Sequence, residues 1–135
     1  MNRILGIDYG SKRIGIAISD PLGLTAQPQK HLVMGPKVWT EIRDLIAEKD
    51  IQKVVVGIPL AMSGNKSAMT LEVESFCEKL RDITKLEVIE VDERLSSKAS
   101  ERLLIEADVS RKKRKSVIDS MAASMILQSY LDTQS

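Results

Sequence analysis

The sequence predicts an α/β domain in which a mixed β-sheet carries helices on its faces. Two β-rich runs, Arg3–Tyr9 and Arg13–Ser19, are separated by only three residues, which predicts an antiparallel hairpin. Further along, strand-like runs alternate with segments whose apolar residues recur at helical spacing. A hairpin meander followed by strand–helix–strand crossovers gives antiparallel pairing first and parallel pairing later, and therefore a mixed sheet.

The remaining elements follow in chain order. Val54-Val55-Val56 is a continuous apolar run, typical of a strand that is covered on both faces. No repeat, low-complexity segment or domain boundary interrupts the pattern, so we expect residues 1–135 to form one domain. We expect a turn at Asp20–Gly23, a strand near Gln29–Met34, a helix opened by Gly35-Pro36, a strand at Lys53–Ile58, a loop at Gly57–Lys66, a helix from Ser67, a strand at Leu86–Val91, and helices at Ser97–Ala107 and Ser116–Leu131.

Composition restricts the class of protein. The 135 residues are enough for one hydrophobic core, and 43% hydrophobic with 29% charged residues is ordinary for a globular protein. No apolar run approaches the ~20 residues that span a bilayer, and the N-terminus shows no signal-peptide pattern. The single cysteine, Cys77, excludes an internal disulfide and fits a reducing compartment. We therefore expect a cytoplasmic protein with no membrane partner.

The first strand holds the most informative residue, Asp8. Because strand side chains alternate between faces, Asp8 shares a face with Gly6 and Gly10, and Leu5, Ile7 and Tyr9 take the other face. The two glycines leave open space around the carboxylate. An ionised group in such a place is costly without a partner, and a metal ion is a strong candidate for that partner.

Two further carboxylates fall where such a sheet would gather them. Glu93 comes just past the last strand, at the carboxyl end where open α/β sheets bind ligands, and Asp119 is expected in the first turn of the final helix. Two ionised carboxylates about 4 Å apart repel by roughly 4 kcal/mol at an effective dielectric near 20. Divalent cations reverse that sign, and oxygen ligands suit Mg²⁺ or Mn²⁺. Two such ions would support hydrolysis of a phosphodiester without a histidine base.

Each carboxylate also has a purely structural explanation. Glu93 is compatible with a solvated charge paired with Arg94, and Ser116 with Asp119 resembles a capping box. Aspartate is disfavoured inside strands, so Asp8 is the hardest to explain structurally.

A solid basic block, Arg111-Lys112-Lys113-Arg114-Lys115, is expected between the last two helices. A solvated loop and a phosphate-contacting loop both fit such a run. The run by itself leaves both interpretations open, and its neighbours must decide between them. The net charge of +1 gives no further indication of a partner.

Four ordered motifs resemble the YqgF/RuvX family, and the resemblance covers nearly the whole chain. The segment Gly6–Ala17 resembles the opening signature of the family, and Val56–Leu60 followed by Ser63-Gly64 resembles its second motif. Asp92–Ser97 resembles the third motif and Asp119–Ala123 the last. Ser97 replaces a threonine that is common in the third motif, which is a minor departure.

The resemblance implies a ribonuclease H-like fold with a five-stranded mixed sheet flanked by helices. It places Asp8, Glu93 and Asp119 at the acidic positions that hold metal and carry catalysis. Family members are described as nucleases that mature the 5′ end of pre-16S rRNA, and some are discussed as Holliday junction resolvases. The expected function is thus a metal-dependent endonuclease, a hydrolase of ester bonds that uses Mg²⁺ or Mn²⁺, as two ions, in ribosome biogenesis.

Under this reading Lys12, Arg13, Arg94 and the basic block contact the nucleic acid, and the Ser63–Lys66 loop is either a flap over the substrate or an ordinary connection. Three alternatives stay open: a resolvase of branched DNA, which favours a homodimer over a monomer; a nucleotide-binding module, because the first turn also resembles the phosphate-binding hairpin of sugar kinases; and a nucleic-acid-binding protein without catalysis.

Overall fold

The computed structural model describes residues 3–59, 67–92 and 111–134, and of residues 111–119 it describes the backbone only. Within these ranges five strands form one mixed sheet, as predicted, in the order β3-β2-β1-β4-β5, so the first strand is central. The strands are β1 (Arg3–Asp8), β2 (Arg13–Ser19), β3 (Ala26–Val33), β4 (Ile51–Ile58) and β5 (Glu87–Asp92).

Strand pairing follows the predicted meander and crossovers. β1 with β2 and β2 with β3 are antiparallel, whereas β1 with β4 and β4 with β5 are parallel. The third strand begins at Ala26 and not near Gln29. It includes Pro28, opposite Ala17, because a strand at the sheet edge tolerates a residue that has no N–H to donate.

Two of the described helices connect strands: α1 leads from β3 to β4, and α2 leads from β4 to β5. α1 (Val38–Lys49) begins after Pro36, which lies before the N-cap residue Lys37 and not in the first helical turn as expected. α2 (Ala68–Thr84) begins at Ser67, whose side chain accepts a hydrogen bond from the backbone N–H of Thr70. The Thr70 hydroxyl in turn accepts from the N–H of Ser67, which completes a capping box.

The last helix corrects two expectations. α4 spans Arg111–Gln134, so the basic block forms its first residues and is not a loop. Lysine and arginine are good helix formers, and no glycine or proline interrupts residues 111–134. Ser116 and Asp119 therefore lie inside the helix, where a capping box is impossible, and Asp119 is not in the first turn. The helix expected at Ser97–Ala107 and residues 60–66 of the loop expected at Gly57–Lys66 lie outside the described residues. Gly57 and Ile58, expected in both that loop and the preceding strand, belong to β4.

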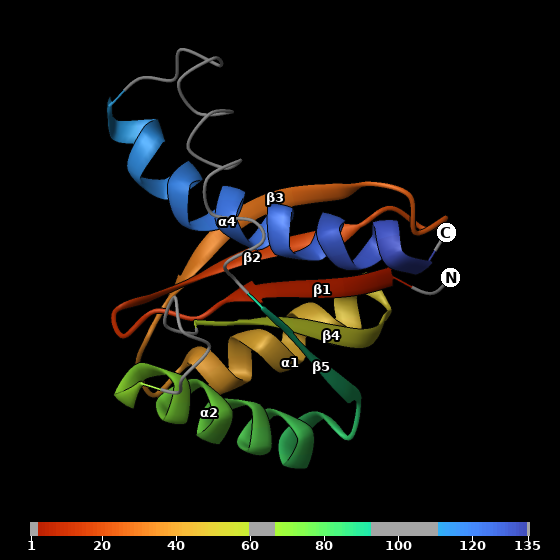
Figure 1. The fold of residues 1–135 in the computed structure, drawn as a ribbon. Coiled ribbons are helices and arrows are strands. Elements are labelled where there is room, and N and C mark those ends of the chain that lie inside the picture. The colour runs from red at the N-terminus through yellow and green to blue at the C-terminus, as the bar shows by residue number, and fades with distance from the viewer. Residues whose placement is uncertain (1–2, 60–66, 93–110, 135) are drawn as a thin grey trace.

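The helices cover opposite faces of the sheet, with α1 and α2 on one face and α4 on the other (Figure 1). The valines of β4 contribute to the hydrophobic cores on both faces of the sheet. Val54 and Val56 belong to the core under α1 and α2, Val55 belongs to the core under α4, and all three are fully buried. This confirms a strand covered on both faces. Among the described helices none combines the length and the apolar character needed to cross a bilayer.

Candidate functional site

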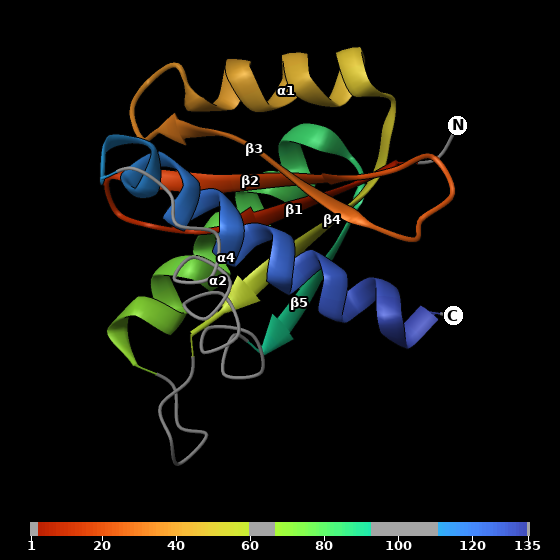
Figure 2. The same ribbon diagram turned by 90° about the horizontal axis from the view of Figure 1, so that it is seen from above.

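The parallel strands place their carboxyl ends at one edge of the sheet. β1 ends at Asp8, β4 at Ile58 and β5 at Asp92, and Ile58 is the register partner of Asp92. Figure 2 shows the sheet from above, with α4 crossing it obliquely and the arrowheads of β4 and β5 side by side. Open α/β sheets bind ligands at this kind of edge, so this edge is the candidate site.

Asp8 lies on the α4 face of β1. Leu5 and Ile7 are fully buried in the core on the other face. Gly6 faces α4, because a Cβ atom on Gly6 would lie 2.8 Å from Leu127 Cβ and 3.1 Å from the carbonyl oxygen of Ala123. Asp8 follows Gly6 by two residues and so shares its face. The half-buried carboxylate thus belongs to the face that the sequence predicted.

α4 runs antiparallel to β1 and brings its N-terminal half toward Asp8. Ile4 lines a pocket with Tyr130 and Leu131, whereas Gly6 meets Leu127 and Ala123. Residue numbers therefore increase along β1 in the direction in which they decrease along α4. Asp8 lies about 6.6 Å beyond Gly6 along the strand. The backbone of Asp119 lies one turn before Ala123, about 6 Å along the helix axis. The two backbones therefore advance to the same end of the sheet.

Small residues let α4 approach the sheet at this end. Ala123 is fully buried, and the buried hydroxyl of Ser120 donates a hydrogen bond to the carbonyl of Gln29 in β3. This contact fixes α4 to the edge strand directly after Asp119. The small side chains of Ser120 and Ala123 therefore permit close packing of α4 against the sheet.

The turn between β1 and β2 borders the same edge. Gly10 is needed there, since a Cβ atom on it would lie 2.4 Å from the carbonyl oxygen of Arg13. Lys12 is exposed, its carbonyl accepts a hydrogen bond from the N–H of Met34 at 2.9 Å, and Arg13 is half-buried at the start of β2. Two cations predicted to contact substrate thus lie in the turn that follows Asp8 and at the start of the next strand.

Other predicted site residues fall outside this description. Glu93, Arg94 and the Ser63–Lys66 loop are not among the described residues, and the side chains of Asp119 and of the Arg111–Lys115 block are not described. Among the side chains that are described, no group of three His, Cys, Asp or Glu residues is arranged to hold a metal ion. The convergence of the three carboxylates stays a prediction.

The donor chemistry at Asp8 nevertheless suits a divalent cation. A carboxylate is a ligand that Mg²⁺ and Mn²⁺ favour, and Asp8 is half-buried at the end of β1. The open space that the sequence predicted at Gly6 and Gly10 is not found, because Leu127 and Ala123 pack against Gly6 and the carbonyl of Arg13 lies against Gly10. Asp8 would be the ligand that the described part of the chain contributes.

Sequence reasoning missed a contact that lies behind Asp8. The hydroxyl of Tyr9 donates a hydrogen bond to Oε1 of Glu72 at 2.7 Å, across 63 positions of sequence. Burial and then the neighbouring Glu72 carboxylate raise the pKa of Tyr9 to about 12. No local pattern marks Glu72, an exposed acid on an amphipathic helix, so nothing in the sequence indicated this pair.

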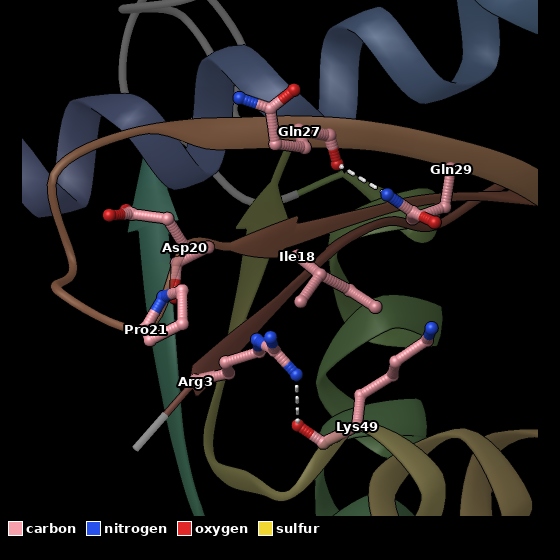
Figure 3. Close-up of a pocket in the computed structure, with 8 residues that line it drawn as sticks. Arg3, Ile18, Asp20, Pro21, Gln27, Gln29 and Lys49 are labelled. Atoms are coloured by element: carbon pink, nitrogen blue, oxygen red, sulfur yellow. Dashed lines mark hydrogen bonds between the residues drawn. The ribbon is translucent and has the colours of Figure 1, made fainter. Parts of the chain in front are cut away.

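A separate pocket of about 220 Å³ lies at the opposite edge of the sheet (Figure 3). Its lining includes Arg3, which donates a hydrogen bond to the carbonyl of Lys49 at 3.4 Å, and the buried Ser19. Arg3 begins β1 and Asp8 ends it, so this part of the pocket lies about 17 Å from Asp8 along the strand. It is not part of the candidate site.

Solved structures of known proteins define the class of this fold. Along 99% of its length the chain is similar to T. thermophilus RuvC in complex with a Holliday junction, covering 96% of that chain with a TM-score of 0.58 and 10% identity. The Holliday junction resolvase of fowlpox virus matches with a TM-score of 0.59 and 17% identity, over 98% of this chain and 99% of the other. The fold is therefore the ribonuclease H-like fold of the RuvC-like resolvases.

The sequence itself gives the family. A family model described as "RuvX: Holliday junction resolvase" matches residues 2–133, and the chain belongs to this family. Relatives from Bacillus thuringiensis (strain Al Hakam) and Bacillus cereus (strain AH820) are each 47% identical over 136 residues. The match covers 98% of this chain and 99% of each relative, and both relatives bear the name "Putative pre-16S rRNA nuclease". The resemblance inferred from the four motifs is confirmed.

Proposed function

We propose that this protein is a divalent-metal-dependent endonuclease that cleaves phosphodiester bonds in precursor 16S rRNA, near the 5′ end, during ribosome biogenesis. The observation that carries the proposal is the position of Asp8, at the carboxyl end of the central strand and on the face covered by α4. Family membership and the names of the relatives support nuclease chemistry and favour ribosomal RNA as the substrate. Such a substrate implies action in the cytoplasm, by one nuclease domain that spans residues 1–135.

We assign catalysis and metal binding to Asp8, Glu93 and Asp119. Ile89 and Val91 pack in the core under α4, and Glu93 follows Val91 by two positions in the sequence. Asp119 lies one helical turn before Ala123, whose carbonyl approaches Gly6 beside Asp8. The chain after β5 and the N-terminal half of α4 therefore both lie toward the end of the sheet that holds Asp8.

Bound Mg²⁺ or Mn²⁺, as two ions, supplies activation of the attacking water and stabilisation of the leaving oxygen. The residues of the chain bind and orient the substrate around that chemistry. Lys12 and Arg13 border Asp8 and are suited to hold the phosphate that is cleaved. We also assign binding of the nucleic-acid backbone to Arg94 and the Arg111–Lys115 block, because cations that neutralise phosphates release counterions on binding.

The test compares wild-type protein with Asp8→Asn on pre-16S rRNA fragments and on four-way DNA junctions, with and without Mn²⁺. We expect wild type to cut the RNA only with metal, EDTA to abolish cutting, and Asp8→Asn to lower the rate by about a hundredfold or more with an unchanged melting temperature. Asp44→Asn is the matched control, since Asp44 is an exposed aspartate on α1, on the other face of the sheet. Activity that survives in Asp8→Asn contradicts the proposal.

A second candidate function is resolution of Holliday junctions. The description of the family and the fold shared with RuvC favour it. Symmetric cutting of the four-way junction, with the RNA left intact, would select this function. It would also require a two-fold dimer, which sedimentation at working concentration detects. Binding of both substrates with no cutting would instead indicate a non-catalytic nucleic-acid-binding protein.

A further inference from the structure

Three of the four aromatic residues of the chain form one column beneath the candidate site. The ring centroids of Tyr9 and Phe76 are 4.9 Å apart, and those of Phe76 and Trp39 are 5.1 Å apart. The column links the end of β1 to α2 and α1, on the face of the sheet opposite Asp8. Aromatic pairs at these separations stabilise beyond the area that they bury. The end of β1 is therefore packed on its far side by a rigid support.

The hydroxyl of Tyr9 gives this support a second anchor. It donates to Oε1 of Glu72 at 2.7 Å, and a hydrogen bond to an ionised carboxylate is stronger than one between neutral groups. With the ring against Phe76 and the hydroxyl on Glu72, the side chain of Tyr9 is held at both ends. Consecutive Cα atoms are only about 3.8 Å apart, so a fixed Tyr9 restricts the backbone of Asp8.

Glu72 lies in the first turns of α2, which the contacts of Thr70 hold in place. Thr70 is fully buried, belongs to the capping box with Ser67, and donates its hydroxyl proton to the carbonyl of Pro59. Pro59 directly follows β4, which pairs with β1. The first turns of α2 thus connect to the ends of two neighbouring strands, to β4 through Thr70 and to β1 through Glu72.

We infer that Tyr9 is a positioning residue, whose contacts with Phe76 and Glu72 hold the end of β1 so that the Asp8 carboxylate keeps a fixed place for metal and substrate. This inference rests on the proposed function. Tyr9 lies on the opposite face from Asp8 and acts through the backbone, so it contacts neither metal nor substrate.

The test uses Tyr9→Phe, which keeps the ring and removes the hydroxyl, together with Glu72→Ala and Glu72→Gln. Gln retains an oxygen that accepts the hydrogen bond from Tyr9, whereas Ala does not. Tyr130→Phe is the matched control, because the hydroxyl of Tyr130 contacts Lys53 Nζ at 3.1 Å, beside residues that begin β1. Glu78→Ala controls for loss of an exposed carboxylate on α2.

Four measurements are made on each protein: kcat and KM for the RNA fragment, the Kd of Mn²⁺ by calorimetry without substrate, the melting temperature, and amide hydrogen exchange at residues 8–10. Removal of a group that orients a ligand residue lowers activity or metal affinity by about 10- to 100-fold. We expect Tyr9→Phe and Glu72→Ala to lose about tenfold in kcat and in Mn²⁺ affinity, with KM within about twofold and faster exchange at residues 8–10. Glu72→Gln and both controls should stay near wild type.

Wild-type kcat, Mn²⁺ affinity and exchange rates in Tyr9→Phe would overturn the inference and leave the proposed function standing. The inference would also be overturned if Glu72→Gln and Glu72→Ala lost kcat and Mn²⁺ affinity equally, in proportion to a drop in melting temperature. That result would indicate a general structural role. A wild-type protein that neither binds Mn²⁺ nor cleaves would overturn the proposed function itself, and this inference with it.

Discussion

Replacement of Gly6 by alanine tests how closely α4 is packed on the central strand. The added Cβ would lie 2.8 Å from Leu127 Cβ and 3.1 Å from the carbonyl oxygen of Ala123. Ordinary contact between carbon atoms is about 3.5–4.0 Å, so Leu127 must recede by about 0.7–1.2 Å. A Cβ atom is fixed to the backbone and cannot rotate away, and a backbone oxygen cannot either. The helix as a whole has to move.

Overpacking of this kind costs about 1–3 kcal/mol, and the lower entropy of unfolded alanine relative to glycine returns about 0.4–1 kcal/mol of that. With both terms near the middle of their ranges, the expected loss is about 1–2 kcal/mol in the free energy of unfolding. For a chain of this length the melting temperature should fall by about 3–10 °C. Under the proposed function the shift also separates Asp119 from Asp8, so cleavage should decrease at temperatures where the variant is fully folded.

The assay is thermal unfolding followed by circular dichroism, with Gly35→Ala as the control. A Cβ atom on Gly35 would meet nothing within 4 Å, so that variant should melt within about 2 °C of wild type. If Gly6→Ala is as stable as wild type, the close approach of α4 to β1 that underlies the site is wrong.

Two further predictions concern buried or hydrogen-bonded groups that titrate. Burial, followed by the charge of Glu90, raises the pKa of the fully buried Cys77 thiol to about 12, so a thiol reagent at pH 8 should label it only after unfolding; rapid labelling of native protein would refute this. Burial and the hydrogen bond to Glu72 raise the pKa of Tyr9 from 10.0 to about 12, so its contribution to stability is complete below pH 10 and is lost as the pH rises toward 12. The Tyr130→Phe variant leaves Tyr9 as the only tyrosine of the chain. Its phenolate absorbance should appear only at a pH well above 10, and a titration midpoint near pH 10 would contradict the assignment.

Local patterns in the sequence determined most of the fold. Alternation along β1 placed Leu5 and Ile7 in one core and Asp8 on the other face, and the structure confirms the two faces. The three consecutive valines of β4 predicted a strand buried on both sides, and Ser67 marked the start of α2. These features depend on the period of a strand or helix and on the chemistry of a cap, which near neighbours in the chain fix.

Helix boundaries were less predictable where charge was dense. The basic block suggested a loop, yet lysine and arginine have high helix propensity, and α4 already begins at Arg111. That error also misplaced Asp119 in a first turn. A run of like charge is compatible with both states, so its neighbours in space decide between them.

What the sequence by itself determined is the family, the mixed sheet and the position of Asp8 at the end of its central strand. Only the tertiary structure showed that Gly6 is the point where α4 meets the sheet and that Tyr9 is bonded to Glu72, 63 positions away. The physical reason is that periodicity and propensity act between near neighbours along the chain, whereas these contacts depend on how separate elements pack. The sequence around Glu72, an exposed residue of α2, therefore does not indicate that it binds Tyr9 at the end of β1.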